Sequence, residues 1–301
     1  MINWSMAVIV IVIFFISVFI IWSKKECSQL SVESINIVSD KNITSTKIIF
    51  LSDLHDKVFG EDNEYLISEI EKNMPDIIMI GGDTMNTHHG NVDFAVTKDL
   101  ILKLKNIAPI YYANGNNEQR LTWESDKFGD SKNQLIRLLK DNDVHYLEDS
   151  YSDIGGVRVY GINLEPEHYH EFWNKKLTVD FIENAIGTID QKKFNILLCH
   201  SPMFINAYAE WGADLVLAGH SHGGVIRFPT DRKKEKGKIN NDLGLTSGQY
   251  QLFHKYCAGV FWKDKTCMIV SRGLGTHTVN IRINNLPQII VVNIDHQEQF
   301  I

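Results

Sequence analysis

The sequence is poor in cysteine and lacks the spacings that would give its cysteines a shared role. Its four cysteines are scattered over 301 residues, and no two form a C-x-x-C pair. This argues against a zinc knuckle and against a small scaffold held by disulfides. The pattern is typical of a reducing compartment. Cys199 lies within an apolar run, and we expect it to be a small buried side chain.

The chain also lacks an excess of basic residues. It contains 30 Lys and Arg against 37 Asp and Glu, so its net charge is −7. Broad, non-specific binding to nucleic acid needs a basic face, so nucleic acid is not an expected partner. The hydrophobic share of 44% is ordinary for a folded protein, and the length provides for a sizeable core.

Charged side chains are missing altogether from Met1 to Trp22. A helix needs about 20 apolar residues to cross a bilayer, and Trp4 and Trp22 lie where interfacial aromatics belong. A cleaved signal peptide would have a basic start, a shorter apolar stretch and small residues at the cleavage point, and none is present. We therefore expect a single-pass anchor in the cell membrane.

The charges that follow this stretch predict its orientation. Lys24 and Lys25 come directly after it, and no basic side chain precedes it. The positive-inside rule then places the rest of the chain on the cytoplasmic side. No internal repeat or interdomain linker is visible beyond it. The expected organisation is an anchor over residues 1–23, a polar link over 24–31 and one catalytic domain over 32–301.

Short apolar runs that end in turn residues alternate with amphipathic segments along most of the chain. This alternation predicts an α/β fold with buried sheets. We expect strands at 47–53, 76–83, 108–116, 157–163, 194–200 and 214–220, and helices at about 62–73, 91–106, 131–142 and 177–188.

The carboxy-terminal third leaves little room for helices. Five apolar runs predict a second, mainly antiparallel sheet: 225–229, 257–262, 266–273, 280–284 and 288–294. A polar stretch at about 230–251 interrupts them. It is either a solvated loop or a basic flap that meets phosphate or an anionic membrane surface, with Arg232, Lys233 and Lys234 as candidate substrate-binding residues.

Polar side chains follow the expected strands directly. In α/β sheets, binding groups gather where strands end. Carboxylates and imidazoles together suit Mn, Fe or Zn, and two such ions about 3.5–4 Å apart need a bridging carboxylate. Each short motif also occurs by chance in other chains. Isolated histidines such as His145 and His168 are expected to be surface or core residues and not metal ligands. The candidate ligands of two divalent metal ions are Asp53, His55, Asp83, Asn116, His200, His220 and His222.

From residue 46 onward, the order of the short motifs resembles the signature of the calcineurin-like metallophosphoesterases: D-x-H, G-D, G-N, an isolated His and G-H-x-H. Three further stretches resemble the family's membrane-anchored bacterial branch: "HSP", "GHSHGG" before "IRFP", and "SRGLG" before "IRIN". The resemblance implies two facing β-sheets flanked by helices, a four-layer sandwich.

The family's roles can be carried over residue by residue. One metal would be held by Asp53, His55, Asp83 and His222, and the other by Asp83, Asn116, His200 and His220, with Asp83 bridging. The implied reaction is hydrolysis of a phosphodiester or pyrophosphate bond by a hydroxide that bridges the metals.

The chain departs from the family pattern at two asparagines. Asn86 stands where a second Asp is common, and Asn117 stands where His usually follows G-N. An amide donates hydrogen bonds but not a proton, so Asn117, which with Asn116 is a candidate catalytic residue, cannot be a general acid. His88, His89 or Glu118 could supply the proton or contact substrate. If none of them does, the absence of a general acid lowers the reaction rate about 10²–10⁴-fold, and by less when the leaving group has a low pKa.

The anchor narrows the expected substrate. A domain tied to the bilayer meets lipid headgroups at high local concentration, and the branch that the chain resembles includes enzymes that cleave phosphodiester or pyrophosphate bonds in lipid-linked sugars and nucleotides. We expect a phosphorylated, lipid-linked substrate. One alternative is a phosphodiesterase or nuclease that acts on soluble nucleotides. The other is a weakened site, marked by Asn86 and Asn117, that serves as a metal-binding scaffold.

Overall fold

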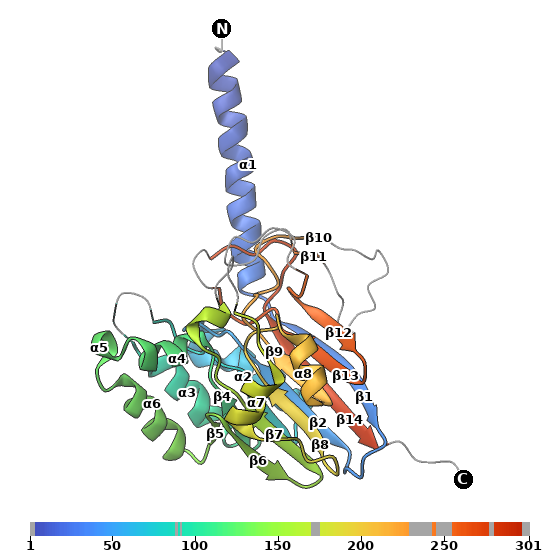
Figure 1. Ribbon diagram of the computed structural model, residues 1–301. Coiled ribbons are helices and arrows are strands. Elements are labelled where there is room, and N and C mark those ends of the chain that lie inside the picture. Colours follow the sequence, from blue (N-terminus) through green and yellow to red (C-terminus); the bar gives the residue numbers. More distant parts are fainter. Residues whose placement is uncertain are drawn as a thin grey trace.

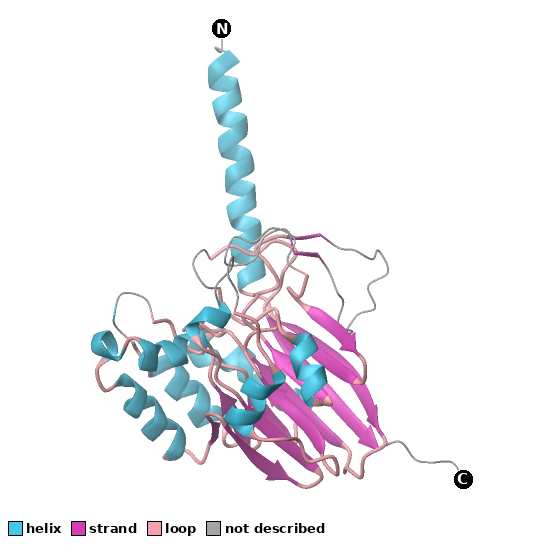
Figure 2. Ribbon diagram, in the orientation of Figure 1, coloured by secondary structure: helices cyan, strands magenta, loops and turns pink. Residues whose placement is uncertain are grey.

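Two facing six-stranded sheets form the centre of the protein, and helices cover both outer faces (Figures 1 and 2). The computed structural model describes residues 4–87, 90, 92–169, 175–228, 243–244, 255–276 and 280–296. This four-layer arrangement confirms the expected α/β sandwich.

The first sheet has the strand order β1-β14-β2-β3-β4-β5. Strands β2 to β5 are parallel, β14 is antiparallel to β2, and β1 is parallel to β14. Its strands are β1 (Ser31–Ser39), β2 (Thr46–Leu51), β3 (Ile77–Ile80), β4 (Ile110–Ala113), β5 (His145–Leu147) and β14 (Gln288–His296).

The second sheet has the order β12-β13-β9-β8-β7-β6, with antiparallel pairing only at its two edges. A separate short pair is formed by β10 (Arg227–Phe228) and β11 (Leu243–Gly244). The strands of the second sheet are β6 (Ser150–Ile154), β7 (Val157–Gly161), β8 (Phe194–Leu198), β9 (Leu215–Ala218), β12 (Gly259–Lys263) and β13 (Thr266–Val270).

The central strands are apolar throughout because both of their faces are buried. In β2, Ile48 and Phe50 join the core between the sheets, whereas Ile49 and Leu51 pack under the helices on the outer face. Continuous apolar runs are typical of such doubly covered strands. The helices are α2 (Glu64–Asn73), α3 (Ala95–Leu104), α4 (Asn116–Trp123), α5 (Ser125–Phe128), α6 (Ser131–Lys140), α7 (Val179–Ile186) and α8 (Ile205–Trp211), with short 3₁₀ turns at Glu61–Asn63 and Pro166–Tyr169.

The expectation of a mainly antiparallel carboxy-terminal sheet was wrong. Strand β13 pairs in parallel with β9 inside the second sheet, and β14 inserts between β1 and β2 in the first. An apolar run indicates a buried strand, but it carries no information on which neighbours the strand pairs with. The run at 280–284 contributes only a bridge between Ile226 and Ile283.

Helix α1 (Trp4–Cys27) projects away from the sandwich (Figure 1). Its most apolar 18-residue stretch has a mean hydropathy of 3.0 and is not buried against the described part of the protein, so by length and composition the helix can cross a membrane. The helix continues through residues 24–27, where the sequence predicted a link. Its last turn is buried at Ser23, Glu26 and Cys27.

The strand directions place the base of α1 at a defined edge. Strand β1 starts at Ser31, soon after α1 ends, and runs opposite to β2. The base of α1 therefore lies at the edge where β2, β3 and β4 end. This is the edge at which the sequence places its candidate ligands.

Candidate metal centre

The ends of strands from both sheets bring the candidate ligands together. Asp53 follows β2, Asp83 follows β3, His200 follows β8, and His220 follows β9. Because these ends meet between the two sheets, residues as far apart in the chain as Asp53 and His222 become neighbours. The carboxylates and the His55, His200 and His222 side chains are buried.

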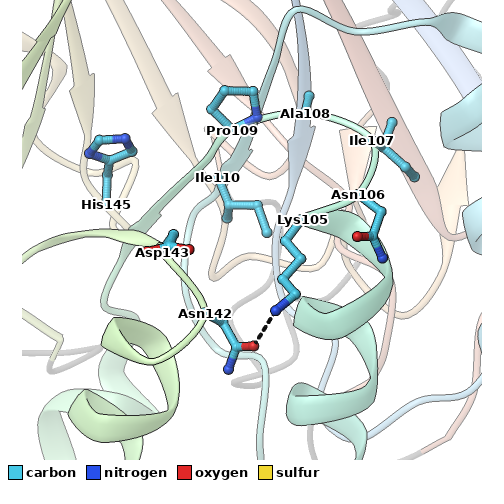
Figure 3. A pocket seen from close by; sticks show the side chains of 9 residues that line it. All are labelled: Lys105, Asn106, Ile107, Ala108, Pro109, Ile110, Asn142, Asp143 and His145. Atoms are coloured by element: carbon cyan, nitrogen blue, oxygen red, sulfur yellow. Dashed lines mark hydrogen bonds between the residues drawn. The ribbon is translucent and has the colours of Figure 1, made fainter.

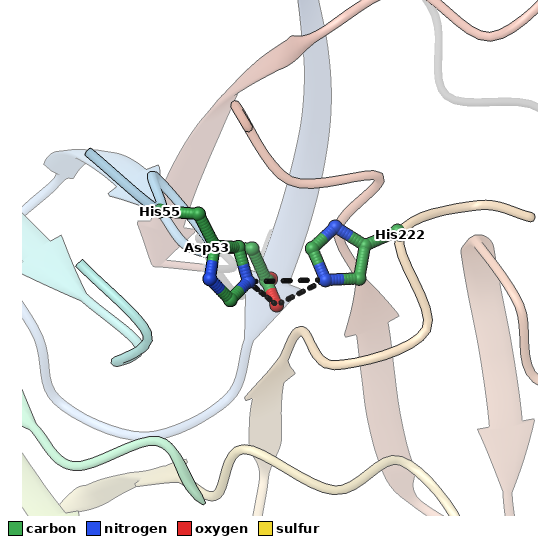
Figure 4. A group of neighbouring side chains, drawn as sticks. All are labelled: Asp53, His55 and His222. Atoms are coloured by element: carbon green, nitrogen blue, oxygen red, sulfur yellow. Dashed lines mark hydrogen bonds and ion pairs between the residues drawn. The ribbon is translucent and has the colours of Figure 1, made fainter. Parts of the chain in front are cut away.

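One group consists of Asp53, His55 and His222 (Figure 4). The Nε2 atom of His222 lies 3.4 Å from Asp53 Oδ1 and 3.2 Å from Nε2 of His55. The Nε2 atom of His55 is 4.0 Å from the same Asp53 oxygen. All three ligand atoms lie within 4.8 Å of one another, which is the spacing of groups that could share one cation.

A second group consists of Asp53, Asp83 and His200. The Nε2 atom of His200 is 3.4 Å from Asp83 Oδ2 and 3.7 Å from Asp53 Oδ1. Asp83 Oδ2 also lies 3.6 Å from His55 Nε2, so this carboxylate stands between the imidazoles of the two groups. Asp53 belongs to both groups. The assignment of the bridge to Asp83 stays a prediction.

Asn116 and His220 lie beside the second group and contact each other. The Nδ1 atom of His220 is 2.8 Å from Asn116 Oδ1, and its backbone N–H donates to Asp53. The His220 ring packs 5.2 Å from the ring of His200 and 5.1 Å from that of Tyr169. All seven predicted ligands are therefore gathered in one place.

The backbone of the ligand loops is strained. Non-glycine residues seldom adopt positive φ, and each such residue costs about 1–3 kcal/mol. Such strain clusters at functional sites, where the surrounding structure holds it in place. Five of the seven ligands have positive φ: Asp53 (53°), His55 (48°), Asp83 (53°), His220 (68°) and His222 (51°).

Glycines give the loops room to approach one another. Gly82 has φ 84°, and a Cβ atom there would lie 1.9 Å from the backbone nitrogen of Gly115. A Cβ atom on Gly219 would lie 2.3 Å from Asp53 Oδ2. Any larger residue at either position would push a ligand loop out of place.

Acceptors behind the imidazoles orient their rings. The Nδ1 atom of His200 is 2.7 Å from the carbonyl oxygen of Gly81, and Nδ1 of His222 is 3.3 Å from that of Gly275. Carbonyls only accept, so Nδ1 carries the hydrogen and Nε2 turns towards the carboxylates. The buried Nε2 of His200 has no hydrogen-bond partner within the part of the chain that the structure describes. A cation would fit between this nitrogen and the two carboxylates that it faces at 3.4 and 3.7 Å.

Asn86 orients His55 in the same way. Its Nδ2 donates to the His55 carbonyl (2.9 Å) and to Asp56 Oδ2 (3.0 Å), which leaves its Oδ1 facing His55 Nδ1 at 3.0 Å. The amide thus fixes the ring with Nε2 towards Asp53 and Asp83. Asn86 therefore orients a candidate ligand although it departs from the family pattern.

The electrostatics of the site also favour a cation. Burial raises the pKa of the Asp53 carboxyl, to which the charge of Asp83 adds. Burial opposes ionisation of Asp83 too, but the charges of His200 and His55 hold its pKa well below the usual range. Burial lowers the pKa of His200, but Asp83 and Asp53 outweigh it and raise it to about 10. Positive charge between the two buried carboxylates therefore stabilises their ionised forms.

Asn117, expected near the reaction itself, is fully buried and bound to Asp83. Its backbone N–H donates to Asp83 Oδ1 and its Nδ2 donates to Asp83 Oδ2, each at 2.8 Å. Its Oδ1 accepts from the Thr87 hydroxyl at 2.6 Å. Every polar group of this side chain is engaged, which is the geometry of a residue that positions a ligand.

Glu118 is a buried link between two loops. Its Oε2 accepts the N–H groups of Asp83 (2.8 Å) and Gly115 (2.9 Å), and its Oε1 accepts from Thr84 N (3.0 Å) and the Tyr112 hydroxyl (2.6 Å). Burial raises its pKa, and Asp83 contributes. These bonds place Glu118 behind the ligands. Five other candidate substrate contacts lie outside the described residues: His88, His89, Arg232, Lys233 and Lys234.

Tyr169 is a neighbour of the site that the sequence did not reveal. Besides packing on His220, it receives a hydrogen bond from Gln119 Nε2 at 3.2 Å. Its stretch, "EPEHYHEF", carries no motif or periodicity that would have singled it out. Its neighbour His168 is a buried histidine among Phe181 and Phe204, with Nδ1 bonded to the Glu165 backbone, as expected of an ordinary core histidine.

A cavity of about 630 Å³ lies elsewhere, around the starts of β4 and β5 (Figure 3). Lys105 crosses part of it and bonds to Asn142 at 2.9 Å, and His145 lines its rim. It lies at the edge opposite the ends of these strands, so it is separate from the metal centre. His145 stacks on Tyr111.

Comparisons with known proteins agree with this geometry. Residues 46–224, more than half of the chain, match the model of the calcineurin-like phosphoesterase family. The chain is 26% identical over 249 residues to the uncharacterized protein YpbG of Bacillus subtilis, covering 82% of this chain and 80% of that protein. It is 27% identical over 259 residues to the phosphodiesterase YaeI of Escherichia coli, covering 84% and 83%.

A third relative is longer than the region it shares. The chain is 30% identical over 202 residues to an uncharacterized metallophosphoesterase of Helicobacter pylori, which is 64% of this chain and 48% of that protein. The chain thus spans about half the length of the Helicobacter pylori protein, and the similarity extends to the shared region alone.

Replacing Asn86 tests the orientation of His55. Asn86→Ala removes the acceptor for His55 Nδ1, so we expect Mn²⁺ affinity to fall about 10–100-fold. Titration calorimetry of the full chain in detergent measures it. Asn106→Ala, which removes an exposed amide bonded to the Leu102 carbonyl of the preceding helix, is the control and should bind Mn²⁺ normally. Equal affinity in folded Asn86→Ala would contradict the orienting role.

Proposed function

The chain belongs to the calcineurin-like phosphoesterase family and is a metal-dependent phosphohydrolase; from that premise, we propose that it hydrolyses a phosphodiester or pyrophosphate bond in a lipid-linked substrate at the membrane surface. One observation supports this most strongly. The carboxylates of Asp53 and Asp83 face the Nε2 atoms of three buried imidazoles at the edge from which α1 projects.

The family uses a dinuclear metal centre, and the two candidate groups fit one. In the proposal, Asp53, His55, Asp83 and His222 would hold one divalent ion. Asp83 would also be a ligand of the second ion, together with Asn116, His200 and His220. Such mixed carboxylate and imidazole sets suit Mn, Fe or Zn. When bound, the ions polarise phosphoryl oxygens and activate water as the attacking group.

The chain's own residues give the site its charge and its rigidity. Two divalent cations would exceed the charge of the two buried carboxylates, so the site attracts anionic phosphate although the chain carries a net charge of −7. Asn117 and Glu118 hold Asp83 from two sides, and Asn86 holds His55. Ligands fixed in this way require little rearrangement when the substrate reacts.

Protonation of the leaving group limits the choice of substrate. Asn117 has no titratable proton, and both oxygens of Glu118 accept hydrogen bonds from the ligand loops. Neither residue is placed to protonate a departing alkoxide. The proposal therefore favours substrates whose leaving group is stable as an anion, such as the phosphate of a pyrophosphate bond.

The position of α1 supports a membrane substrate. The base of α1 and the ligands share one edge of the sandwich, so a spanning α1 would turn the site edge towards the bilayer (Figure 1). Lys24 and Lys25 in its last turn favour the cytoplasmic side. A headgroup in the same membrane then meets the site at high effective concentration.

Asp83→Asn tests whether the site catalyses hydrolysis. Removal of this carboxylate charge should lower kcat/KM for a chromogenic phosphodiester with added Mn²⁺ at least about 100-fold. Replacing a group that only holds a metal ligand already lowers metal affinity or activity about 10–100-fold. Asp99→Asn, on the outer face of α3 and paired with Lys103, is the control. Equal rates in Asp83→Asn and the unaltered protein would contradict the proposed catalytic site.

A leaving-group series tests the missing general acid. Across methyl aryl phosphates of graded leaving-group pKa, the rate should fall steeply as that pKa rises, by about 10²–10⁴-fold between the extremes. Initial rates with saturating Mn²⁺ measure the slope. A flat series would show that another group supplies the proton.

A matched substrate pair tests the lipid. A pyrophosphate-linked lipid in nanodiscs that also carry the protein should be cleaved about 10²-fold or more faster than its short-chain soluble analogue at equal bulk concentration. Equal rates on both, or faster cleavage of a free nucleotide diester, would favour the soluble-nucleotide alternative. Metal binding with no hydrolysis of any substrate would favour the scaffold.

A further inference from the structure

Residues 282–285 connect helix α1 to the metal centre. The run at 280–284 predicts a strand, but in the structure Ile283 only bridges to Ile226, and the segment lies between the base of α1 and the loop that carries His222. Two of its polar side chains, Arg282 and Asn285, are each only 1% exposed. Buried polar side chains need partners, and theirs lie on both sides of the segment.

On the membrane side, α1 accepts hydrogen bonds from the backbone of this segment. The Ser23 hydroxyl oxygen accepts the N–H of Arg282 at 3.0 Å, and Glu26 Oε2 accepts the N–H of Asn285 at 2.9 Å. The other Glu26 oxygen accepts from the indole of Trp22 at 2.9 Å. A carboxylate that is 8% exposed therefore joins the last turns of α1 to residue 285.

On the site side, Asn285 holds the backbone around His222. Its Nδ2 donates to the His222 carbonyl at 2.8 Å and also to the carbonyl of Gly224. Both partners only accept, so both amide hydrogens are required and the orientation of the amide is fixed. Its Oδ1 has no hydrogen-bond partner among the described residues, which shows that the two donated bonds set this orientation.

Arg282 holds the acceptor behind the His222 ring. Its Nη2 donates to the carbonyl of Gly275, which lies 3.3 Å from His222 Nδ1, and to the carbonyl of Arg272 at 2.9 Å. Its Nη1 donates to the Asn285 carbonyl at 3.1 Å. Burial lowers the pKa of Arg282 to about 10, so the guanidinium stays charged at neutral pH.

We propose that Asn285 is a positioning residue for the metal ligand His222, and that Glu26 of α1 holds Asn285 in place. The membrane helix is thereby a structural part of the metal centre. His222 has φ 51°, a conformation that needs support from its surroundings, and Asn285 bonds to its carbonyl. The proposal rests on the metal-binding function proposed above.

The direct test replaces one atom of Asn285. Asn285→Asp keeps the shape but cannot donate to two carbonyls, so one of the two Mn²⁺ sites should weaken about 10–100-fold. Titration calorimetry on the full chain in detergent gives the number of sites and their affinities. The matched control is Asn293→Asp, which changes an amide on β14 bonded to Asn36 and should bind as the unaltered protein does.

A second pair of variants tests the helix and also covers a failure of Asn285→Asp to fold. Glu26→Ala removes the acceptor for Asn285 N–H and should weaken the same Mn²⁺ site, whereas Glu26→Gln keeps an acceptor and should restore it. A merely structural role would lower the unfolding temperature of Glu26→Ala without changing Mn²⁺ affinity in the folded protein.

The outcomes separate this proposal from the proposed function. If the unaltered protein binds two Mn²⁺ and the Asn285 and folded Glu26 variants bind them equally well, the positioning role is overturned while the function stands. If the unaltered protein binds no Mn²⁺, both fall. If the variants lose one site while the unaltered protein binds two ions but cleaves no phosphoester, only the function falls.

Discussion

Two carboxylates buried side by side, Asp53 and Asp83, set the constraint on which the rest of the structure depends. Ionised groups removed from water are costly unless positive charge lies next to them. Here the Nε2 atoms of His55, His200 and His222 point at these carboxylates, each ring turned by an acceptor behind it. Cations between these groups would stabilise the arrangement, whose ligand side chains are already held in place for the family's phosphoesterase chemistry.

The sandwich supplies the rigidity that this arrangement needs. Strands β2 and β3 are buried on both faces, so the strained loops that follow them start from fixed ends. Glu118 ties the loops after β3 and β4 together, and residues 282–285 tie the His222 loop to α1. The candidate metal site lies on the edge that carries α1, the helix apolar enough to cross a membrane.

The sequence was sufficient for the parts of this account that depend on local pattern. Apolar runs followed by Asp, Asn or His located six strands and all seven candidate ligands, because strand ends and their polar residues are adjacent in the chain. The pairing of β13 and β14 could not be read this way, since burial on both faces gives the same run in any sheet position. Nor could the roles of Asn117, Tyr169 or Asn285, which arise from contacts with residues at least 34 positions away.

The most direct test of the central claim is to locate the metals. Crystals of the full chain grown with Mn²⁺, with diffraction recorded at the manganese absorption edge, would show the ions by anomalous scattering. The account predicts two peaks between Asp53 and Asp83, one beside His55 and His222 and the other beside His200 and His220. A single peak, or peaks away from these carboxylates, would contradict it.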